Sequence, residues 1–412
     1  MNASRLISSL KLFYTLFIVP PKEWKLPKKS EILVYDARGA EALAPYLVKY
    51  RVTVMAVRGE SICVPCLLHA MLKLKFWKGR LPEAYAKAFI QAVSPKIIIT
   101  FVDNDRRFYT ISKHSSAAKT LFIQNGLRGG RTDVFERLVR SESYHVDHML
   151  VFGAAVGRKY KAYITGSVLP IGSFRNNTAK KTNIVTDGSV LVISQYRDKP
   201  KNNAPLLTVE NEKSVPHDQY FSAEVIALRF IAKWCIENQK SLKIAGASVA
   251  KAGPETDFFE VVLSGYAWEY IPKIGHYSSY KLVDAAEIVV FIDSTLGYES
   301  IARGKKTASF SCRGVSLNDE SRKFGWPADL PNNGPFWTND QDEMQFQRIM
   351  DYLNTVDDEE WEKTRQYYST ELMEFDPGNK RFIALLDQLL PGAVKPAGGN
   401  ASNLLNDSVH DL

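Results

Sequence analysis

Short apolar runs alternate with helical stretches along most of the chain. In the first half the strand-like runs lie at 31–35, 51–57, 96–102, 119–123, 148–152 and 168–171. They are continuously apolar, which is typical of parallel strands covered by helices on both faces. The pattern therefore predicts a doubly wound α/β domain.

The same alternation starts again after a polar, charged segment at 174–188, which we interpret as the connection between two domains. An amphipathic helix is expected at 222–237, and strands are expected at 190–194, 242–246, 286–292 and 306–311. We therefore expect two Rossmann-like doubly wound domains facing across a cleft. The predicted boundaries are 1–30 for a basic amphipathic segment, 31–178 for the first domain, 186–340 for the second, 341–390 for C-terminal helices and 391–412 for a flexible tail.

The formal net charge of +8 indicates an anionic partner. No nucleic-acid-binding motif accompanies the basic residues, so we expect no nucleic acid partner. Residues 1–30 hold six Lys or Arg and one Glu, and the apolar positions within 6–18 fall on one helical face. This segment is either a helix that lies on an anionic membrane surface or a first helix packed on its own domain. No stretch is long and apolar enough to predict a transmembrane helix.

The four cysteines suggest no disulfide scaffold. Cys63 and Cys66 form one C-x-x-C, while Cys235 and Cys312 are isolated. A single pair without a second pair or nearby histidines favours buried, neutral thiols over a zinc or redox site. We therefore expect a reducing compartment, no metal and no cofactor.

The strand at 286–292 ends in Asp-Ser-Thr-Leu-Gly-Tyr-Glu, and a helix is expected to follow. A helix start offers free backbone N–H groups and the positive end of a dipole, to which Ser294 and Thr295 add hydroxyl donors. Gly297 completes the motif, and Glu299 lies one turn further, where a carboxylate reaches ribose hydroxyls. The pattern predicts nucleotide binding here, with contributions from His276 and Gln195.

Ligands of doubly wound sheets bind outside the carboxyl ends of the strands. In the first domain the polar residues at these ends are Arg38, Arg58, Glu60, Asp103, Asn104, Asp105, Gln124, Asn125 and Arg128. Asp103 follows a strand expected to be central, so its carboxylate is a candidate base or nucleophile, with Asp105 and Glu60 as competitors. A helix-capping or turn role is the alternative for each carboxylate.

The second domain resembles the nucleotide-binding half of GT-B glycosyltransferases, on the strand followed by the Ser294 motif and Ala-Arg-Gly-Lys at 302–305. More narrowly, the chain resembles bacterial surface-carbohydrate proteins related to Kdo (3-deoxy-manno-octulosonate) transferases. The matching pieces are Phe-Val-Asp-Asn at 101–104, Phe-Ile-Gln-Asn-Gly at 122–126 and Leu-Pro-Ile-Gly-Ser-Phe at 169–174. The resemblance implies a CMP-activated donor and metal-independent transfer to a lipid-linked glycan. His276 is followed by Tyr277, whereas the family pattern has His-Pro.

We therefore expect a glycosyltransferase that moves Kdo or a related sugar acid from a CMP-sugar donor to a growing O-antigen, capsule or lipopolysaccharide acceptor. Arg38, Arg58 and Arg128 are expected to hold the donor carboxylate. Asn104, Gln124 and Asn125 complete the donor and acceptor site. The expected location is the cytoplasm, at the inner face of the bacterial inner membrane. The alternatives are a UDP-sugar-dependent transferase or 2-epimerase of the same fold, and a non-catalytic docking module.

Overall fold

The computed structural model describes residues 20–72, 81–115, 117–129, 133–138, 143–182, 184–200, 207–209, 213–275 and 277–392. The predicted membrane-surface helix within 6–18, the candidate His276 and most of the predicted flexible tail lie outside these residues.

The first domain is built on a six-stranded parallel sheet in the order β3-β2-β5-β6-β7-β8. The strands are β2 (Ile32–Tyr35), β3 (Val52–Met55), β5 (Ile97–Thr100), β6 (Lys119–Ile123), β7 (Tyr144–Val151) and β8 (Ile164–Pro170). Alternate residues enter two separate apolar clusters, with Ile32 in one and Leu33 in the other. Both faces of the sheet are therefore buried, as the continuous apolar runs predict.

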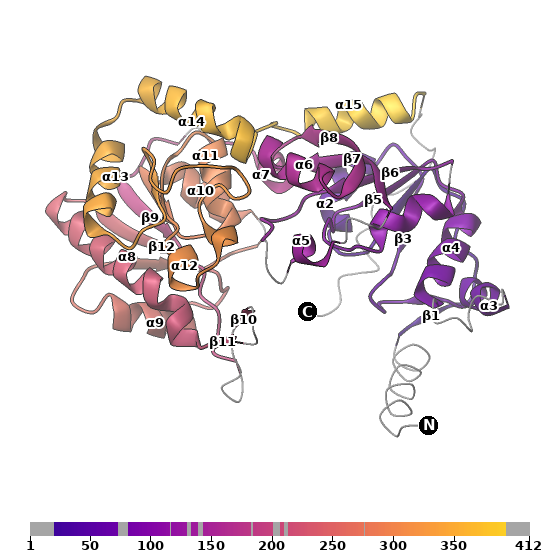
Figure 1. Cartoon of the computed structure of the whole chain (residues 1–412), viewed down its shortest axis with the longest axis horizontal. Coiled ribbons are helices and arrows are strands. Elements are labelled where there is room, and N and C mark those ends of the chain that lie inside the picture. The colour runs from indigo at the N-terminus through magenta and orange to yellow at the C-terminus, as the bar shows by residue number, and fades with distance from the viewer. Residues whose placement is uncertain are drawn as a thin grey trace.

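Helices cover both faces of this sheet (Figure 1). They are α2 (Ala40–Leu47), α3 (Val64–Leu72), α4 (Leu81–Val93), η2 (Phe108–His114), α5 (Val134–Arg137), α6 (Ala154–Lys161) and α7 (Phe174–Thr178). A short pair, β1 (Lys22–Glu23) with β4 (Ile62–Cys63), ties the start of the described chain to the segment before α3.

The second domain has a six-stranded parallel sheet in the order β13-β12-β9-β14-β15-β16. The strands are β9 (Ser189–Ile193), β12 (Ser241–Ala245), β13 (Glu269–Ile271), β14 (Ile288–Phe291), β15 (Lys306–Phe310) and β16 (Trp337–Thr338). Counted within the domain this is the dinucleotide-fold order 3-2-1-4-5-6, which reverses between β9 and β14. That reversal places the switch point beside the predicted nucleotide motif.

The remaining elements surround the second sheet and then return to the first. They are the hairpin β10 (Leu207–Val209) and β11 (Lys213–Val215), and the helices α8 (His217–Glu237), α9 (Pro254–Val262), α10 (Ser278–Ala285), α11 (Thr295–Ala302), α12 (Arg313–Ser316), η5 (Glu320–Arg322), α13 (Glu343–Thr355), α14 (Asp358–Leu372) and α15 (Lys380–Leu389). The helix expected at 222–237 begins earlier, at His217, directly after Pro216.

The chain crosses between the domains twice, and α15 lies on the first domain (Figure 1). Its Phe382 ring packs edge-on against Phe174 at 5.2 Å. The two crossings are hydrogen-bonded to each other, because the Asn177 side chain accepts from the Asp376 amide at 3.0 Å and donates to Asn379 at 3.0 Å. The segment expected to be a plain polar linker thus contains a helix and buried asparagines.

The four cysteines are buried free thiols, as predicted. Burial raises the pKa of the Cys66, Cys235 and Cys312 thiols to about 12. In the described part of the chain, no cluster of three or more His, Cys, Asp or Glu side chains could hold a metal ion. Within the same residues, every helix is too short or too polar to cross a membrane.

Candidate functional site at the domain junction

The carboxyl edge of the second sheet carries a charged cluster centred on Asp293, which follows β14. Arg313 donates from Nη1 to Asp293 Oδ1 at 2.5 Å, and Arg322 donates from Nη1 to Oδ2 at 3.0 Å. Burial opposes ionisation of Asp293, but the two guanidinium groups outweigh it and lower the pKa of the carboxyl. Asp293 is therefore ionised and held between two cations.

Arg313 is fully buried and bridges two carboxylates. Its Nη2 donates to Glu224 Oε2 at 2.7 Å, and its guanidinium lies 4.3 Å from the centre of the Tyr220 ring. Among the residues that the structure describes, Glu224 Oε1 and Arg313 Nε have no hydrogen-bond partner. Burial raises the pKa of Glu224 to about 7. Arg322 retains partial exposure, with 22% of its side chain accessible, so it is the cation of this cluster that a ligand can reach.

The helix α11 begins at this edge, as the Asp-Ser-Thr pattern predicts. Ser294 is its N-cap and accepts from the Leu296 amide at 3.2 Å. A Cβ on Gly297 would lie 2.1 Å from the Phe291 ring, so only glycine lets the helix pack this closely on β14. Thr295, the first residue of this eight-residue helix, accepts from the Leu127 amide of the first domain, so the positive end of the helix lies at the domain junction.

Glu299 lies within α11 and points away from any open surface. It is 6% exposed, and its two oxygens accept from the hydroxyls of Ser173 and Tyr280. Burial raises the pKa of Glu299 to about 7. The expected contact with ribose hydroxyls would require these hydrogen bonds to be exchanged; the structure shows instead a contact between the domains, since Ser173 belongs to the first.

A second buried contact lies beside it. Arg303 donates to both oxygens of Asp284, at 2.9 and 2.6 Å, and to the Asn176 side chain at 3.1 Å. Gln195, after β9, accepts from the Asp293 amide at 3.0 Å and so links the two strands that flank the switch point. Its side chain thus holds the backbone directly before Ser294.

The first domain meets α11 through the loop after β6. The Leu127 amide donates to Thr295 Oγ1 at 3.3 Å, and the Phe135 ring lies 5.8 Å from Trp326 of the second domain. The edge that carries Asn125 and Arg128 therefore adjoins the predicted nucleotide motif. The structure brings these first-domain residues together with Ser294 and Thr295.

Asp103 holds this loop in place. Its carboxylate is fully buried and accepts from Arg128 at 2.7 Å, from the Tyr160 hydroxyl at 2.6 Å and from the Asn125 amide at 3.1 Å. Arg128 in turn is 8% exposed and also contacts Asn125 Oδ1. The candidate base and the candidate carboxylate-binding arginine are thus each other's partners.

The other first-domain candidates differ in their exposure and in whether their side chains are already paired. Asp105 is paired in a bidentate manner with Arg107, at 2.9 and 2.7 Å. Glu60 is exposed and accepts the Arg58 amide at 2.9 Å, while Arg58 Nε donates to the buried Asp36 at 2.7 Å. Arg38 and Asn104 are exposed. Gln124 is buried, where it accepts from the Phe152 amide at 2.9 Å and donates to the Gly126 carbonyl.

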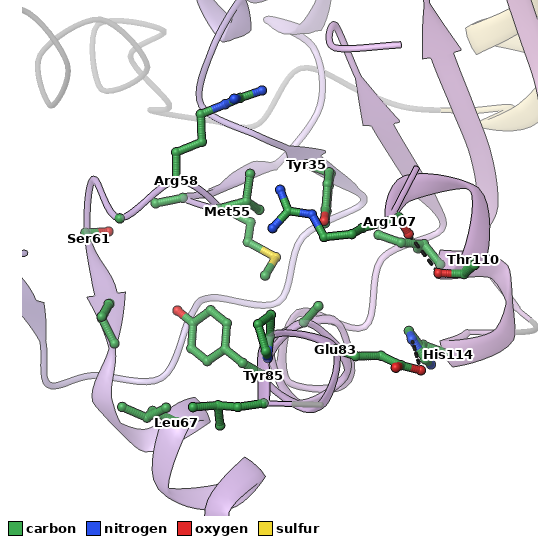
Figure 2. Close-up of a pocket in the computed structure, with 18 residues that line it drawn as sticks. Tyr35, Met55, Arg58, Ser61, Leu67, Glu83, Tyr85, Arg107, Thr110 and His114 are labelled. Carbon is green, nitrogen blue, oxygen red and sulfur yellow. Dashed lines mark hydrogen bonds and ion pairs between the residues drawn. The ribbon is translucent and has the colours of Figure 1, made fainter. Parts of the chain in front are cut away.

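A cavity of about 460 Å³ opens at the carboxyl edge of the first sheet, where β2 and β3 end (Figure 2). Arg58 and Arg107 line it together with Tyr35, Met55 and Tyr85. A smaller cavity of about 230 Å³ lies beside α9 in the second domain, where the buried Glu255 accepts from Tyr270 and Ser194. The large cavity was not foreseen, because its walls come from five separate segments.

Sequence reasoning also missed Arg313, Arg322 and Glu224. Arg313 follows the strand expected at 306–311, so the rule that collects polar residues at strand ends could have found it. Glu224 lies in the middle of an amphipathic helix, where nothing in the pattern separates a buried glutamate from a solvated one.

Several solved structures are similar to this chain, and the first one described here identifies the fold. A structure described as "putative UDP-N-acetylglucosamine 2-epimerase from Listeria monocytogenes" aligns over 87% of this chain and 96% of its own, with a TM-score of 0.51 and 10% identity. A glycosyltransferase from Rickettsia africae gives a TM-score of 0.48 at 11% identity over 88% and 99%, and the wall teichoic acid polymerase TagF gives 0.47 at 10% over 93% and 96%. The fold is GT-B, and the predicted pair of Rossmann-like domains is confirmed.

The sequence itself matches a protein family over residues 121–390, more than half of the chain. The family is described as "putative O-antigen biosynthesis protein", and the chain belongs to it. No curated protein matches the sequence.

Proposed function

We propose that this protein is a glycosyltransferase of O-antigen assembly that binds a nucleotide-sugar donor at the carboxyl edge of the second sheet. The observation that carries the proposal is the Asp293–Arg313–Arg322 cluster beside the N-terminus of α11, at the point where Leu127 of the first domain meets Thr295. Helix N-terminal amides and a reachable guanidinium suit a phosphate group. Membership of the O-antigen family supports the glycan substrate.

The donor that we propose first is a CMP-activated sugar acid such as CMP-Kdo. A sugar carboxylate needs a cation besides those that bind phosphate, and the first-domain edge supplies the exposed Arg38. The acceptor is a lipid-linked glycan, and the basic segment before residue 30 would bring the protein to the inner face of the membrane. The base is Glu60 or Asp105, since Asp103 acts as a positioning residue that holds Arg128.

A UDP-sugar donor is the second candidate. It is favoured by the structure with the TM-score of 0.51, whose description names a UDP-N-acetylglucosamine 2-epimerase. The two candidates differ in the nucleobase of the donor, which is cytosine in CMP and uracil in UDP. An epimerase also differs from a transferase in that it needs no acceptor. An epimerase converts its donor alone, whereas a transferase releases the nucleotide only when an acceptor glycan is present.

Calorimetric titration with CMP, UDP and GDP, each with and without Mg²⁺, tests the proposal. We expect selective binding of CMP and a loss of about tenfold or more in affinity for Arg322→Ala, as removal of a charged hydrogen bond predicts. Lys363→Ala, on the exposed face of α14, is the matched control and should bind as the parent does. Selective UDP binding would contradict the CMP-sugar donor and support the UDP-sugar donor. Absence of binding by all three nucleotides would favour the docking module.

Catalytic roles are tested by turnover of CMP-Kdo with an acceptor. Glu60→Gln and Asp105→Asn should leave nucleotide affinity unchanged, and one of them should lower kcat by about 10²-fold or more. If both retain parental turnover, neither carboxylate is the base.

A further inference from the structure

The large cavity of the first domain has apolar walls and a polar mouth (Figure 2). Its walls are formed by Met55, Val57, Ile62, Leu67, Tyr85 and Ile111. A space of about 460 Å³ lies within the range of about 300–1,000 Å³ that ligand sites occupy.

Two guanidinium groups at the mouth have unused donors. Asp105 takes Nε and Nη2 of Arg107, and Asp36 takes Nε of Arg58. Arg107 Nη1 and both terminal nitrogens of Arg58 make no hydrogen bond with any residue that the structure describes. Figure 2 shows the Arg107 guanidinium extending between Tyr35 and Met55, over the apolar space.

The carboxylate of Glu83, which also lines the cavity, lies too far from the mouth to repel an anion bound there. Glu83 lies on α4 at 3.5 Å from His114 Nε2, and Figure 2 shows this pair away from the Arg58 side. The unused donors at the mouth therefore lie apart from the Glu83 carboxylate and next to the apolar walls. A ligand that satisfies both must be amphipathic.

We propose that this cavity binds a single apolar chain that ends in a phosphate, with the chain against Met55 and Ile111 and the phosphate at Arg107 and Arg58. Three unused donor nitrogens in planar guanidinium groups match the several acceptor oxygens of a phosphate. Two sources share this chemistry, an isoprenyl phosphate and a fatty-chain phosphate. The cavity adjoins Asp105 through Arg107, so under the proposed function its ligand belongs to the acceptor side; binding itself does not depend on that function.

The test is calorimetric titration of the full chain with farnesyl phosphate and with dodecyl phosphate, both below their micelle concentrations. We expect saturable binding with one site per chain for at least one of them. Binding of farnesyl phosphate alone identifies an isoprenyl phosphate, binding of dodecyl phosphate alone identifies a fatty-chain phosphate, and equal binding of both supports a site for an apolar-chain phosphate of either kind. Farnesol and inorganic phosphate should each bind at least tenfold more weakly. Saturable binding by neither phosphate, or equal binding of farnesol, would overturn the proposal.

Two variants locate the site. Arg107→Ala should weaken binding about tenfold or more, whereas Arg106→Ala, an exposed neighbour whose side chain reaches the Arg137 carbonyl, should not. Thr110→Trp should fill the half-buried rim of the cavity and abolish binding. The thermal midpoint and the nucleotide titration of each variant distinguish a folding defect from loss of this site. Parental affinity in Arg107→Ala and Thr110→Trp would place the ligand elsewhere.

Discussion

Arg313 and Asp293 form a salt bridge of 2.5 Å whose cation is fully buried, and the same guanidinium holds Glu224 at 2.7 Å. One positive charge therefore lies between two carboxylates in an environment from which water is largely excluded. Arg322 supplies the second cation from the exposed side. The arrangement fixes the strand end that precedes α11, so the position of the proposed phosphate site is set by a buried ion network.

Removal of the buried cation should be costly. Arg313→Met leaves Glu224 and Asp293 without their shared partner, and breaking a buried pair in this way costs about 3–5 kcal/mol. Urea denaturation monitored by circular dichroism measures the loss. Lys363→Met removes an exposed i,i+4 pair and should cost about 0.5 kcal/mol or less. Equal, small effects of the two substitutions would contradict a structural role for the network.

Glu299 should make stability depend on pH. Its folded pKa of about 7 is raised by burial, so the folded state holds the proton more tightly than the unfolded one. The contribution is fully present below the unfolded pKa of about 4.5 and is lost as the pH rises to about 7, by about 3 kcal/mol. Denaturation at a series of pH values should show a fall that is smaller by about 3 kcal/mol in Glu299→Gln than in the parent, because Glu224, whose pKa is also about 7, contributes its own fall to both proteins.

The exposed Glu359 provides the control for that series. Glu359→Gln should keep the parental pH dependence, since its carboxylate is 81% accessible. A parallel decline in parent and Glu299→Gln would mean that another group, such as Glu224, carries the whole effect.

Asp103 should behave as an anchor of the domain junction. Asp103→Asn removes the charge that neutralises the buried Arg128, so we expect a loss of about 3 kcal/mol and a weakened loop at Leu127. Asp105→Asn breaks a more exposed pair and should cost about 1 kcal/mol or less. Thermal unfolding of both variants checks this. Parental stability of Asp103→Asn combined with lost turnover would return Asp103 to the role of base.

Gly297 should tolerate no side chain. An added methyl group would lie 2.1 Å from the Phe291 ring, so Gly297→Ala is expected to cost about 1–3 kcal/mol, although alanine otherwise favours a helix. In the double variant with Phe291→Leu the two effects should be less than additive, because the smaller side chain relieves the clash. Gly126→Ala, whose nearest neighbour is 3.9 Å away, should have little effect. Strict additivity would show that the clash is relieved by other means.

The strands and their polar ends were predictable because short-range patterns encode them. The apolar run before Asp293 and the Ser-Thr cap of α11 are local signals, and the structure has both where expected. Asp103 likewise follows a central buried strand. These features need only the periodicity of neighbouring residues.

The partners of those residues were not predictable, because they come from distant segments. Glu299 is satisfied by Ser173 and Tyr280, which no spacing rule connects to it. The strong amphipathic pattern of α15 shows that one face is buried, but it does not tell which domain receives it. The cavity beside Arg107 depends on how α4 packs against η2, which again is a matter of tertiary placement.

The return of α15 to the first domain has a consequence for synthesis on the ribosome. Domains emerge and fold from the N-terminus, yet Phe382, near the end of the described chain, packs on Phe174 and Tyr46 of the first domain, and Leu385 and Leu386 join the same buried cluster. The nascent first domain must therefore keep an apolar face open until the entire second domain has been translated. A chaperone that shields this face in the meantime would act on the domain made first, and a premature stop late in the message would damage that same domain.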